Sequence, residues 1–493
     1  MSNPKQSAFE TGGLTELACE TSHAAPHDLS RHLPIAFVVL GTAIGLIYAF
    51  VMPPLQVADE GSHFARLYSV SRGTCVASPD IDIPQSFAQL NALFPPWLER
   101  SRRMPLTDLH AALKIPLNHS VMAGNARQRS LEGFINQNLY CCLPYVPAAM
   151  VLNAARHLRL PPLALMYLSR ITNLAAYIAL TFFALRLLPD FRWVLFCVAL
   201  MPMTMHQAAS ISADSMGFAL SFLLCAYVLR LAFAKPPIAM GLRQLLVLGL
   251  LVLLAALSRS MVAFVVLPLL IPAANFKSSL RRWSATAAYA LLALLCLGLW
   301  QHVNRSNFER MAEERMGRPA LVDVASNTRF LYQHPLAIAS MFARTAADFD
   351  YVRAKLTELV GRFGWLSVSL PGWLVCLYLG LLIAAALTQT RHTRLAWGAR
   401  AILLLFVWAG AINILTAGWV LETPIVVLGV PASWPRFQVL SQGRYWIPLV
   451  FPALVLLANT KIQFNSRVFA AGALAVLLIA NGFAAHAIYH TYY

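Results

Sequence analysis

The stretch that decides the fold of this chain is residues 33–66, LPIAFVVLGTAIGLIYAFVMPPLQVADEGSHFAR. Its first part, 33–52, is apolar and carries no charged side chain, and it is long enough to cross a bilayer as a helix. Its second part brings two adjacent carboxylates, Asp59 and Glu60, soon after Pro53 and Pro54. Carboxylates at a membrane surface are costly unless they meet cations, a metal ion or a substrate. The stretch therefore predicts an anchoring helix followed by a functional acidic pair.

The composition of the whole chain agrees with a membrane protein. Of its 493 residues, 58% are hydrophobic and only 12% are charged, whereas a soluble domain is typically about 25% charged. Apolar runs recur along the chain and are separated by basic residues and prolines, which predicts an all-α polytopic membrane protein. The net charge of +17 comes from Lys and Arg beside these runs. We expect them to fix orientation in the membrane, and we expect no nucleic-acid partner.

About eleven apolar runs are candidates for transmembrane helices. They are 33–52, 163–188, 193–211, 215–233, 243–257, 260–274, 284–303, 371–388, 399–418, 444–460 and 467–487. The stretch 139–157 is also apolar and is the alternative twelfth span.

Orientation follows from the basic residues. With the N-terminus inside and 139–157 lying along the membrane, every short inside loop carries Lys or Arg, for example Arg186 and Arg192. Counting 139–157 as a span would move most of these residues outside. Pro144 and Pro147 also make this stretch a poor straight span, so we predict a juxtamembrane helix there.

This topology divides the chain into four parts. Residues 1–32 are polar and unpatterned, and we expect a disordered cytoplasmic tail. A seven-span module follows over 33–303 and includes a large outside loop, 53–162. A second outside loop covers 304–370, and further spans occupy 371–493.

The polar residues that stand out all fall on the outer face of the predicted helix bundle. They are Asp59, Glu60, His63, Arg66, Asp214, Arg259, Arg362, Arg444 and Tyr445. Because helices of a bundle meet at their ends, these side chains are expected to share one cavity at the outer membrane surface.

Carboxylates and arginines together suit a hydroxyl nucleophile and a phosphate. We expect Asp59 to act as the catalytic base or as a metal ligand, with Glu60 and Asp214 assisting. A divalent metal ion on Asp59 and Asp214 is one way to stabilise a phosphate leaving group. The other way is a set of arginine side chains, which form charge-assisted hydrogen bonds with phosphate. The residues expected to contact substrate or phosphate are His63, Arg66, Arg259, Arg362, Arg444 and Tyr445.

Each of these residues also has a purely structural alternative. Asp59 and Glu60 are suited to the N-terminus of a juxtamembrane helix, and Asp214 is suited to the N-cap of the span that follows it. Arg444 is placed where a long side chain can reach lipid head groups. His63 can be a plain interfacial histidine.

Three cysteines fall in the first large loop. If that loop is extracytoplasmic, Cys75 is expected to form a disulfide with Cys141 or Cys142.

Several motifs in the chain are similar to those of a known family. The run from Pro53 to Phe64 resembles the opening signature of a large family of predicted bacterial integral-membrane proteins, a domain of unknown function grouped with the GT-C glycosyltransferase superfamily. Further similar runs are Leu168–Asn173, Ser212–Asp214, Gly361–Leu366 and Gln442–Tyr445. The resemblance covers roughly residues 35–460.

The resemblance implies a GT-C-like fold, in which long outside loops follow the first and seventh spans and the first loop carries juxtamembrane helices. It also implies a polyprenyl-phosphate-linked sugar as donor and a catalytic acid in the first outside loop. Asp59 or Glu60 would occupy that position, and Asp214 that of a second acid.

We therefore expect a glycosyltransferase of the bacterial inner membrane with its site on the periplasmic side. Its partners would be the polyprenyl-phosphate donor, membrane lipids, and a glycan, lipid or protein acceptor. Two alternatives remain at this point: a transporter or flippase of a polar or lipid-linked substrate, and a non-catalytic subunit of an envelope assembly.

Overall fold

The computed structural model describes residues 29–493 except 78–83, 119–134, 189, 317–321, 389–394, 423–440, 459–461 and 463–464. The predicted tail 1–32 lies outside the described residues apart from Leu29–His32, which form one 3₁₀ turn before the first span.

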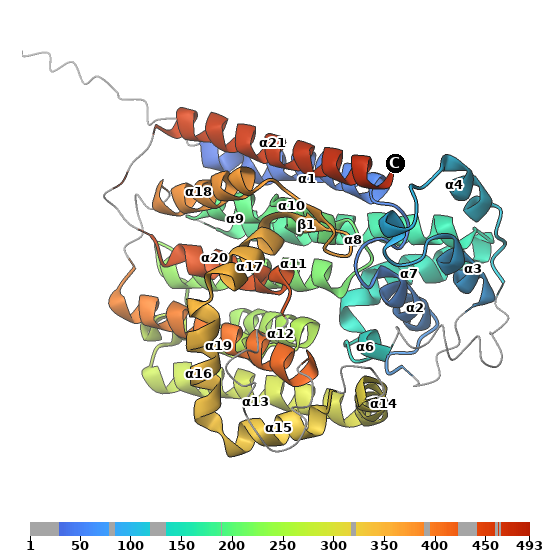
Figure 1. Cartoon of the computed structure of the whole chain (residues 1–493). Helices are drawn as coiled ribbons and strands as arrows, with labels where there is room; N and C mark the ends of the chain where they lie inside the picture. Colours follow the sequence, from blue (N-terminus) through green and yellow to red (C-terminus); the bar gives the residue numbers. More distant parts are fainter. Residues whose placement is uncertain are drawn as a thin grey trace, which may run out of the picture.

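The described chain is almost entirely helical (Figure 1). Its longer α-helices are α1 (Leu33–Val51), α8 (Pro162–Leu187), α11 (Ala213–Phe233), α12 (Leu242–Arg259), α13 (Ser279–Val303), α18 (Gly372–Thr388), α19 (Trp397–Glu422) and α21 (Ser466–Tyr492). The shorter ones are α2 (Glu60–Ser71), α3 (Gln85–Leu93), α4 (Leu106–Leu113), α6 (Ile135–Asn138), α7 (Val146–Ala155), α9 (Arg192–Ala199), α10 (Pro202–Ala208), α14 (Arg305–Met316), α15 (Val324–Gln333), α16 (Pro335–Ala347), α17 (Phe349–Gly361) and α20 (Ile447–Val455). One small hairpin pairs β1 (Arg362–Phe363) with β2 (Val368–Ser369), with Arg362 opposite Ser369.

Seven helices in the described part of the chain are long and apolar enough to cross a membrane: α1 with the turn before it, α8, α11, α12, α13, α19 and α21. This confirms a multi-pass helical membrane protein. The predicted count of eleven spans is not confirmed, because four of the predicted spans form shorter or interrupted helices. Within the bundle, α11 is the most buried of the seven and packs against α8 and α12, while α1 packs against α8 and α21.

The predicted span 193–211 is interrupted in its middle. Pro202 has no N–H to continue the helix of α9, so α9 ends at Ala199 and α10 starts after the break. Carbonyl groups at such a break need partners, because no water reaches the centre of a bilayer. Side chains from other helices provide them: the Tyr378 hydroxyl donates to the Cys197 carbonyl at 2.7 Å, Tyr177 to Ala199 at 2.8 Å, and the Asn481 amide to Leu200 at 3.1 Å.

Proline also shapes two of the other three predicted spans that were not counted as long helices. Residues 260–274 fold as a 3₁₀ helix, Val262–Leu270, which contains Pro268 and is followed by a second 3₁₀ turn. Residues 444–460 begin in the 3₁₀ turn Gly443–Trp446 and continue as α20, which contains Pro452. The fourth, α18, is a regular apolar helix of 17 residues.

The loop 53–162, predicted to lie outside, forms a cap of short helices at one end of the bundle, where α2, α3, α4 and α7 gather on the right of Figure 1. That this loop carries short helices agrees with the prediction. The Gln56 side chain holds the first segment of this loop in place. It donates to the Pro95 carbonyl at 2.9 Å and accepts from the Leu98 N–H at 3.1 Å. Gly364, in the turn of the β1–β2 hairpin, lies beside the same segment: a Cβ on it would be 3.5 Å from the Gln56 carbonyl oxygen. The second long loop therefore ends against the start of the first.

Candidate functional site

Two carboxylates from distant parts of the chain share one arginine at the predicted outer face. Asp59 lies directly before α2, and Asp214 lies in the first turn of α11. Arg444, in the 3₁₀ turn before α20, donates from Nη2 to the Asp59 Oδ2 at 3.2 Å, and its Nε lies 3.2 Å from the Asp214 Oδ2. The loop after α1, the start of α11 and the start of α20 thus meet at one point.

A second arginine extends this group. Arg259, the last residue of α12, donates to the other oxygen of the Asp214 carboxylate. Gly217 makes room for it one turn into α11, because a Cβ at this position would lie only 2.4 Å from the Arg259 Cδ. The guanidinium groups of Arg259 and Arg444 both lie over the ring of Tyr445, 5.7 and 5.4 Å from its centroid.

We call Asp59, Arg444, Asp214 and Arg259 the acid–arginine chain. Solvent reaches its members very unequally. The Asp59 side chain is 34% exposed, whereas those of Asp214, Arg259 and Arg444 are 5–6% exposed. Asp59 is therefore the member of the chain that an incoming molecule can reach most easily.

The Asp59 backbone has an uncommon conformation, and its side chain is directed to Arg444. Asp59 has φ of 65°, in the left-handed region that Asp tolerates better than most residues. Its side chain makes no capping bond to α2. This carboxylate therefore does not act as a helix cap, which was the structural alternative. Asp214 is not the N-cap of α11 either, since Ser212 fills that position and accepts from the Asp214 N–H.

His63 follows Asp59 by one turn of α2 and faces two tyrosines. Its Nδ1 lies 2.6 Å from the Tyr145 hydroxyl, and its ring centroid is 5.6 Å from that of Tyr140. Burial lowers the pKa of His63 to about 4, and the nearby carboxylates Asp59 and Asp214 only partly oppose this shift. Burial raises the pKa of both tyrosines. At neutral pH, these three side chains therefore form an uncharged hydrogen-bonding wall beside the acid–arginine chain.

Glu60 points away from this group, in spite of being next to Asp59. Both of its oxygens accept from Arg170 of α8, at 2.8 and 2.5 Å, and the backbone N–H of Ile211 donates to it at 3.1 Å. Arg170 also donates to the carbonyls of Ala49, Met52 and Pro53 at the end of α1. Glu60 and Arg170 are both fully buried, so the geometry gives Glu60 a structural role in place of the assisting catalytic role expected from the sequence.

Arg66 is likewise occupied elsewhere. It donates to the backbone carbonyls of Thr74 and Cys75 and so fixes the segment after α2. Cys75 forms a disulfide with Cys142, one of the two pairings expected, and Cys141 is a buried free thiol. The disulfide places residues 140–145, which include both tyrosines of the wall, against α2.

Arg362 lies in β1 and does not join the acid–arginine chain. Its Nε donates to the Leu366 carbonyl at 2.8 Å, and its Nη1 lies 3.8 Å from Glu358 of α17. Glu358 in turn accepts from the backbone N–H of Gly443 at 2.8 Å. Lys355 is the closer partner of Glu358, since its Nζ donates to both carboxylate oxygens at 2.9 Å. Arg362 is thus connected to the turn that carries Arg444 only through Glu358.

The donor set does not suit a divalent metal ion on Asp59 and Asp214, one of the two ways of stabilising phosphate that the sequence left open. In the part of the chain that the structure describes, no group of three or more His, Cys, Asp or Glu side chains is arranged to hold a metal ion. More directly, Arg444 lies between the two carboxylates and Arg259 binds the second oxygen of Asp214. A metal ion would have to displace guanidinium groups from these oxygens, so the geometry assigns their neutralisation to arginine.

Sequence reasoning missed Arg170, Tyr140 and Tyr145 as residues that shape the site. Arg170 had a signal, because a charged side chain in the middle of an apolar run must find a partner inside the protein. The two tyrosines had none, since they stand in a loop rich in apolar residues and gain their role only from the packing of α7 and its preceding turn on α2.

Comparison with known proteins gives one result. A family model described as "Predicted membrane protein (DUF2142)" matches residues 43–453, a range that includes every member of the acid–arginine chain. No curated protein matches the chain, and no solved structure does. Since the family model covers most of the sequence, the chain belongs to the predicted membrane protein family DUF2142.

Proposed function

We propose that this protein is a membrane glycosyltransferase that moves a sugar from a polyprenyl-phosphate donor to a hydroxyl group of a glycan, lipid or protein. The observation that carries the proposal is the acid–arginine chain at one end of the helical bundle. Its accessible carboxylate, Asp59, pairs with the buried Arg444, and Asp214 links Arg444 to a second buried arginine, Arg259. Such a group can accept a proton and hold a phosphate within the same small volume. We place it on the periplasmic face of a bacterial inner membrane, with the N-terminus in the cytoplasm.

The proposed reaction is an inverting displacement. The acceptor oxygen forms a bond to the anomeric carbon of the sugar as the bond from that carbon to the donor phosphate breaks. Asp59 takes the proton of the acceptor hydroxyl. The negative charge left on the polyprenyl phosphate is stabilised by Arg444, with Arg259 behind it.

Asp214 acts as a positioning residue in this scheme. It lies between the two arginines and keeps both guanidinium groups fixed before a donor binds. Preorganised charges of this kind are effective because they need no rearrangement during the reaction. His63, Tyr140 and Tyr145 would line the sugar side of the site with neutral hydrogen-bonding groups.

The test compares lipid-linked sugars and envelope glycans by mass spectrometry in cells with the wild-type protein, the deletion and Asp59→Asn. The matched control is Asp350→Asn, an acid with an 84% exposed side chain on α17. We expect the deletion and Asp59→Asn to lose the same sugar and to accumulate its polyprenyl-linked donor, with membrane insertion unchanged. The proposal is wrong if Asp59→Asn cells keep that sugar at the wild-type level.

A transporter is the second candidate, and the break between α9 and α10 is the observation in its favour. Discontinuous membrane helices often bind substrates or ions through free backbone groups. Here the carbonyls of Cys197, Ala199 and Leu200 at the break already accept hydrogen bonds from side chains, which leaves less capacity for an ion. Accumulation of an unprocessed substrate on one side of the membrane, with no sugar lost, would favour transport.

A non-catalytic assembly subunit is the remaining alternative. It is the better account if the function survives removal of both Asp59 and Glu60.

A further inference from the structure

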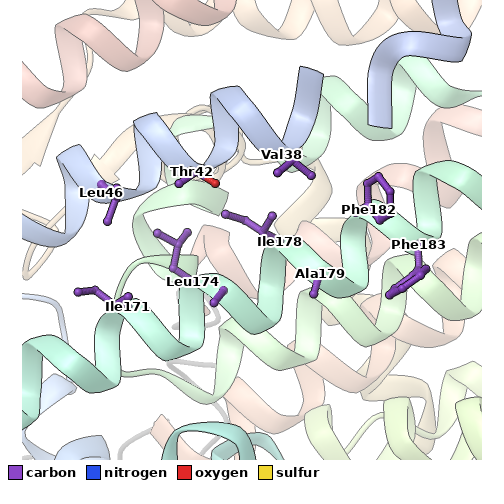
Figure 2. A pocket seen from close by; sticks show the side chains of 10 residues that line it. Val38, Thr42, Leu46, Ile171, Leu174, Ile178, Ala179, Phe182 and Phe183 are labelled. Atoms are coloured by element: carbon purple, nitrogen blue, oxygen red, sulfur yellow. The ribbon is translucent and has the colours of Figure 1, made fainter. Parts of the chain in front are cut away.

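A groove of about 440 Å³ lies between α1 and α8, away from the acid–arginine chain. Figure 2 shows the two helices side by side, with the lining side chains of both drawn as sticks. The lining is Val38, Thr42 and Leu46 from α1 and Ile171, Leu174, Ala175, Ile178, Ala179, Phe182 and Phe183 from α8. Except for the Thr42 hydroxyl, these side chains are apolar. The groove therefore suits a hydrocarbon chain.

Close helix packing beside small side chains creates the groove. Gly45 lets α1 approach α8 so closely that a Cβ at this position would lie 2.4 Å from the Leu174 side chain. Farther along α8, Ala175 and Ala179 are too small to fill the space beside α1. Ile171 and Phe183, at the two ends of the lining, are twelve residues apart on α8, about 18 Å at 1.5 Å per residue. That length is close to the hydrocarbon thickness of one leaflet, about 15 Å.

The two ends of the groove differ. Beyond Leu46 and Ile171, the rings of Phe50 and Tyr167 stack across the two helices with centroids 5.4 Å apart, and they bridge α1 and α8 on the side of the candidate site. At the opposite end the guanidinium of Arg186 lies 5.8 Å from the centroid of Phe182. Arg186 is exposed there, and Arg31 and His32, also exposed, immediately precede α1. This is the end that the basic loops predict to be cytoplasmic.

We propose that the groove binds an anionic phospholipid of the cytoplasmic leaflet. One acyl chain lies along the groove from Phe182 toward Ile171, and the phosphate rests on Arg186, with Arg31 and His32 beside it. Apolar lining and cationic side chains at one end of the same groove together match a lipid of this charge. The aromatic bridge at the other end separates this lipid from the acid–arginine chain, so the inference does not depend on the proposed sugar transfer.

The test uses purified full-length protein in nanodiscs that contain phosphatidylglycerol and phosphatidylcholine. After transfer to detergent, native mass spectrometry counts the lipids retained by each protein molecule. Arg186→Gln removes the charge at the end of the groove, and Ala179→Trp fills the groove. The matched controls are Arg281→Gln, an exposed arginine at the start of α13, and Leu291→Trp, a 60% exposed side chain on the same helix.

We expect the wild type and both controls to retain phosphatidylglycerol in preference to phosphatidylcholine. Arg186→Gln should weaken this retention about fivefold, the ratio that corresponds to about 1 kcal/mol for one basic side chain near an anionic lipid. Ala179→Trp should abolish it. Arg186→Gln gives an answer even if Ala179→Trp disturbs folding, because its side chain is exposed.

Three outcomes would overturn the proposal. One is equal retention of the two lipids by the wild type. Another is the same loss in the Arg281→Gln control as in Arg186→Gln, which would mean that only general membrane charge matters. The third comes from a parallel set of nanodiscs that also contain a long-chain isoprenyl phosphate: if this lipid displaces phosphatidylglycerol, the groove belongs to a different lipid.

Discussion

At the scale of single residues, two adjacent carboxylates have opposite environments. Asp59 is partly exposed and lies against Arg444, whereas Glu60 is fully buried and bound by Arg170. Because the two side chains leave the backbone in different directions, one is open to a ligand and the other stabilises the junction of α1, α2 and α8. Neighbouring acids in the sequence therefore need separate mutational tests.

Replacing Glu60 should affect folding more than chemistry. Removing one partner of a buried ion pair leaves an uncompensated charge and typically costs about 3–5 kcal/mol. We expect Glu60→Ala to lower the thermal unfolding midpoint strongly and to reduce the folded yield. Asp59→Asn should change both less, because Asn also tolerates the positive φ at this position and the replaced side chain is partly exposed. Fluorescence-detected size exclusion during heating measures this difference. Similar melting of the two variants would argue against the structural role of Glu60.

His63 predicts a pH dependence of stability. The folded pKa is about 4, whereas an unfolded histidine titrates near pH 6.5. Between these values the unfolded chain binds a proton that the folded protein does not, so stability falls as the pH drops from about 6.5 to about 4. This single shift corresponds to about 3 kcal/mol at its full extent.

The measurement is thermal unfolding at pH 7 and at pH 4.5 in one detergent. His63→Gln should lose less stability than the wild type over this interval, and His110→Gln, an exposed histidine of α4, should behave like the wild type. Identical pH dependence in the wild type and His63→Gln would show that this histidine is not buried as described.

At the scale of elements, prolines interrupt apolar runs, and side chains that donate to the freed carbonyls make such interruptions stable. Pro202 interrupts the run 193–211, and Pro268 and Pro452 lie in two other runs that form short or 3₁₀ helices. An interruption inside the bundle is stable only when its backbone groups have partners. Tyr177, Tyr378 and Asn481 supply them from three different helices.

Removing one of these hydrogen-bond donors should destabilise the bundle. Tyr378→Phe keeps the ring and leaves the Cys197 carbonyl without its donor, which should cost about 1–3 kcal/mol because the group stays buried. Tyr332→Phe is the matched control, since Tyr332 on α15 is 84% exposed. Chemical unfolding in mixed micelles measures the difference. Equal stability of the two variants would mean that the break does not rely on this hydroxyl.

At the scale of the whole molecule, the two long loops between predicted spans come together at one end of the bundle. The β1–β2 hairpin at the end of the second long loop lies beside Gln56, and Gln56 fastens the start of the first loop to residues 95–98. The disulfide between Cys75 and Cys142 closes a stretch of 67 residues within the first loop. Together these links hold Tyr140, Tyr145 and His63 next to the acid–arginine chain.

The disulfide should stabilise the cap and, through it, the candidate site. A bond that closes a loop of this length typically contributes about 2–4 kcal/mol. We expect the double variant Cys75→Ser with Cys142→Ser to melt earlier than the wild type, and the wild type in a reducing agent to match it. Cys141→Ser serves as the control for loss of a cysteine outside the bond. No change in melting on reduction would contradict this role.

The sequence alone determined the class of the protein and picked out four polar residues that meet at one end of the bundle. Apolar runs of bilayer length predicted a multi-pass helical protein, and seven long helices bear this out. It also singled out Asp59, Asp214, Arg259 and Arg444, which the tertiary structure joins into one chain of charges. These features are readable because hydropathy and charge act locally along the chain.

Only the tertiary structure decided which polar residues share a site and which apolar runs stay continuous. Glu60, Arg66 and Arg362 had the right composition and the right face, but each finds its partners elsewhere. Glu60 pairs with Arg170, and Tyr378 donates to a carbonyl at the α9–α10 break; in both cases the partners are far apart in sequence. Such choices depend on which helices pack together, since a buried charge or carbonyl takes the partner that packing brings within reach.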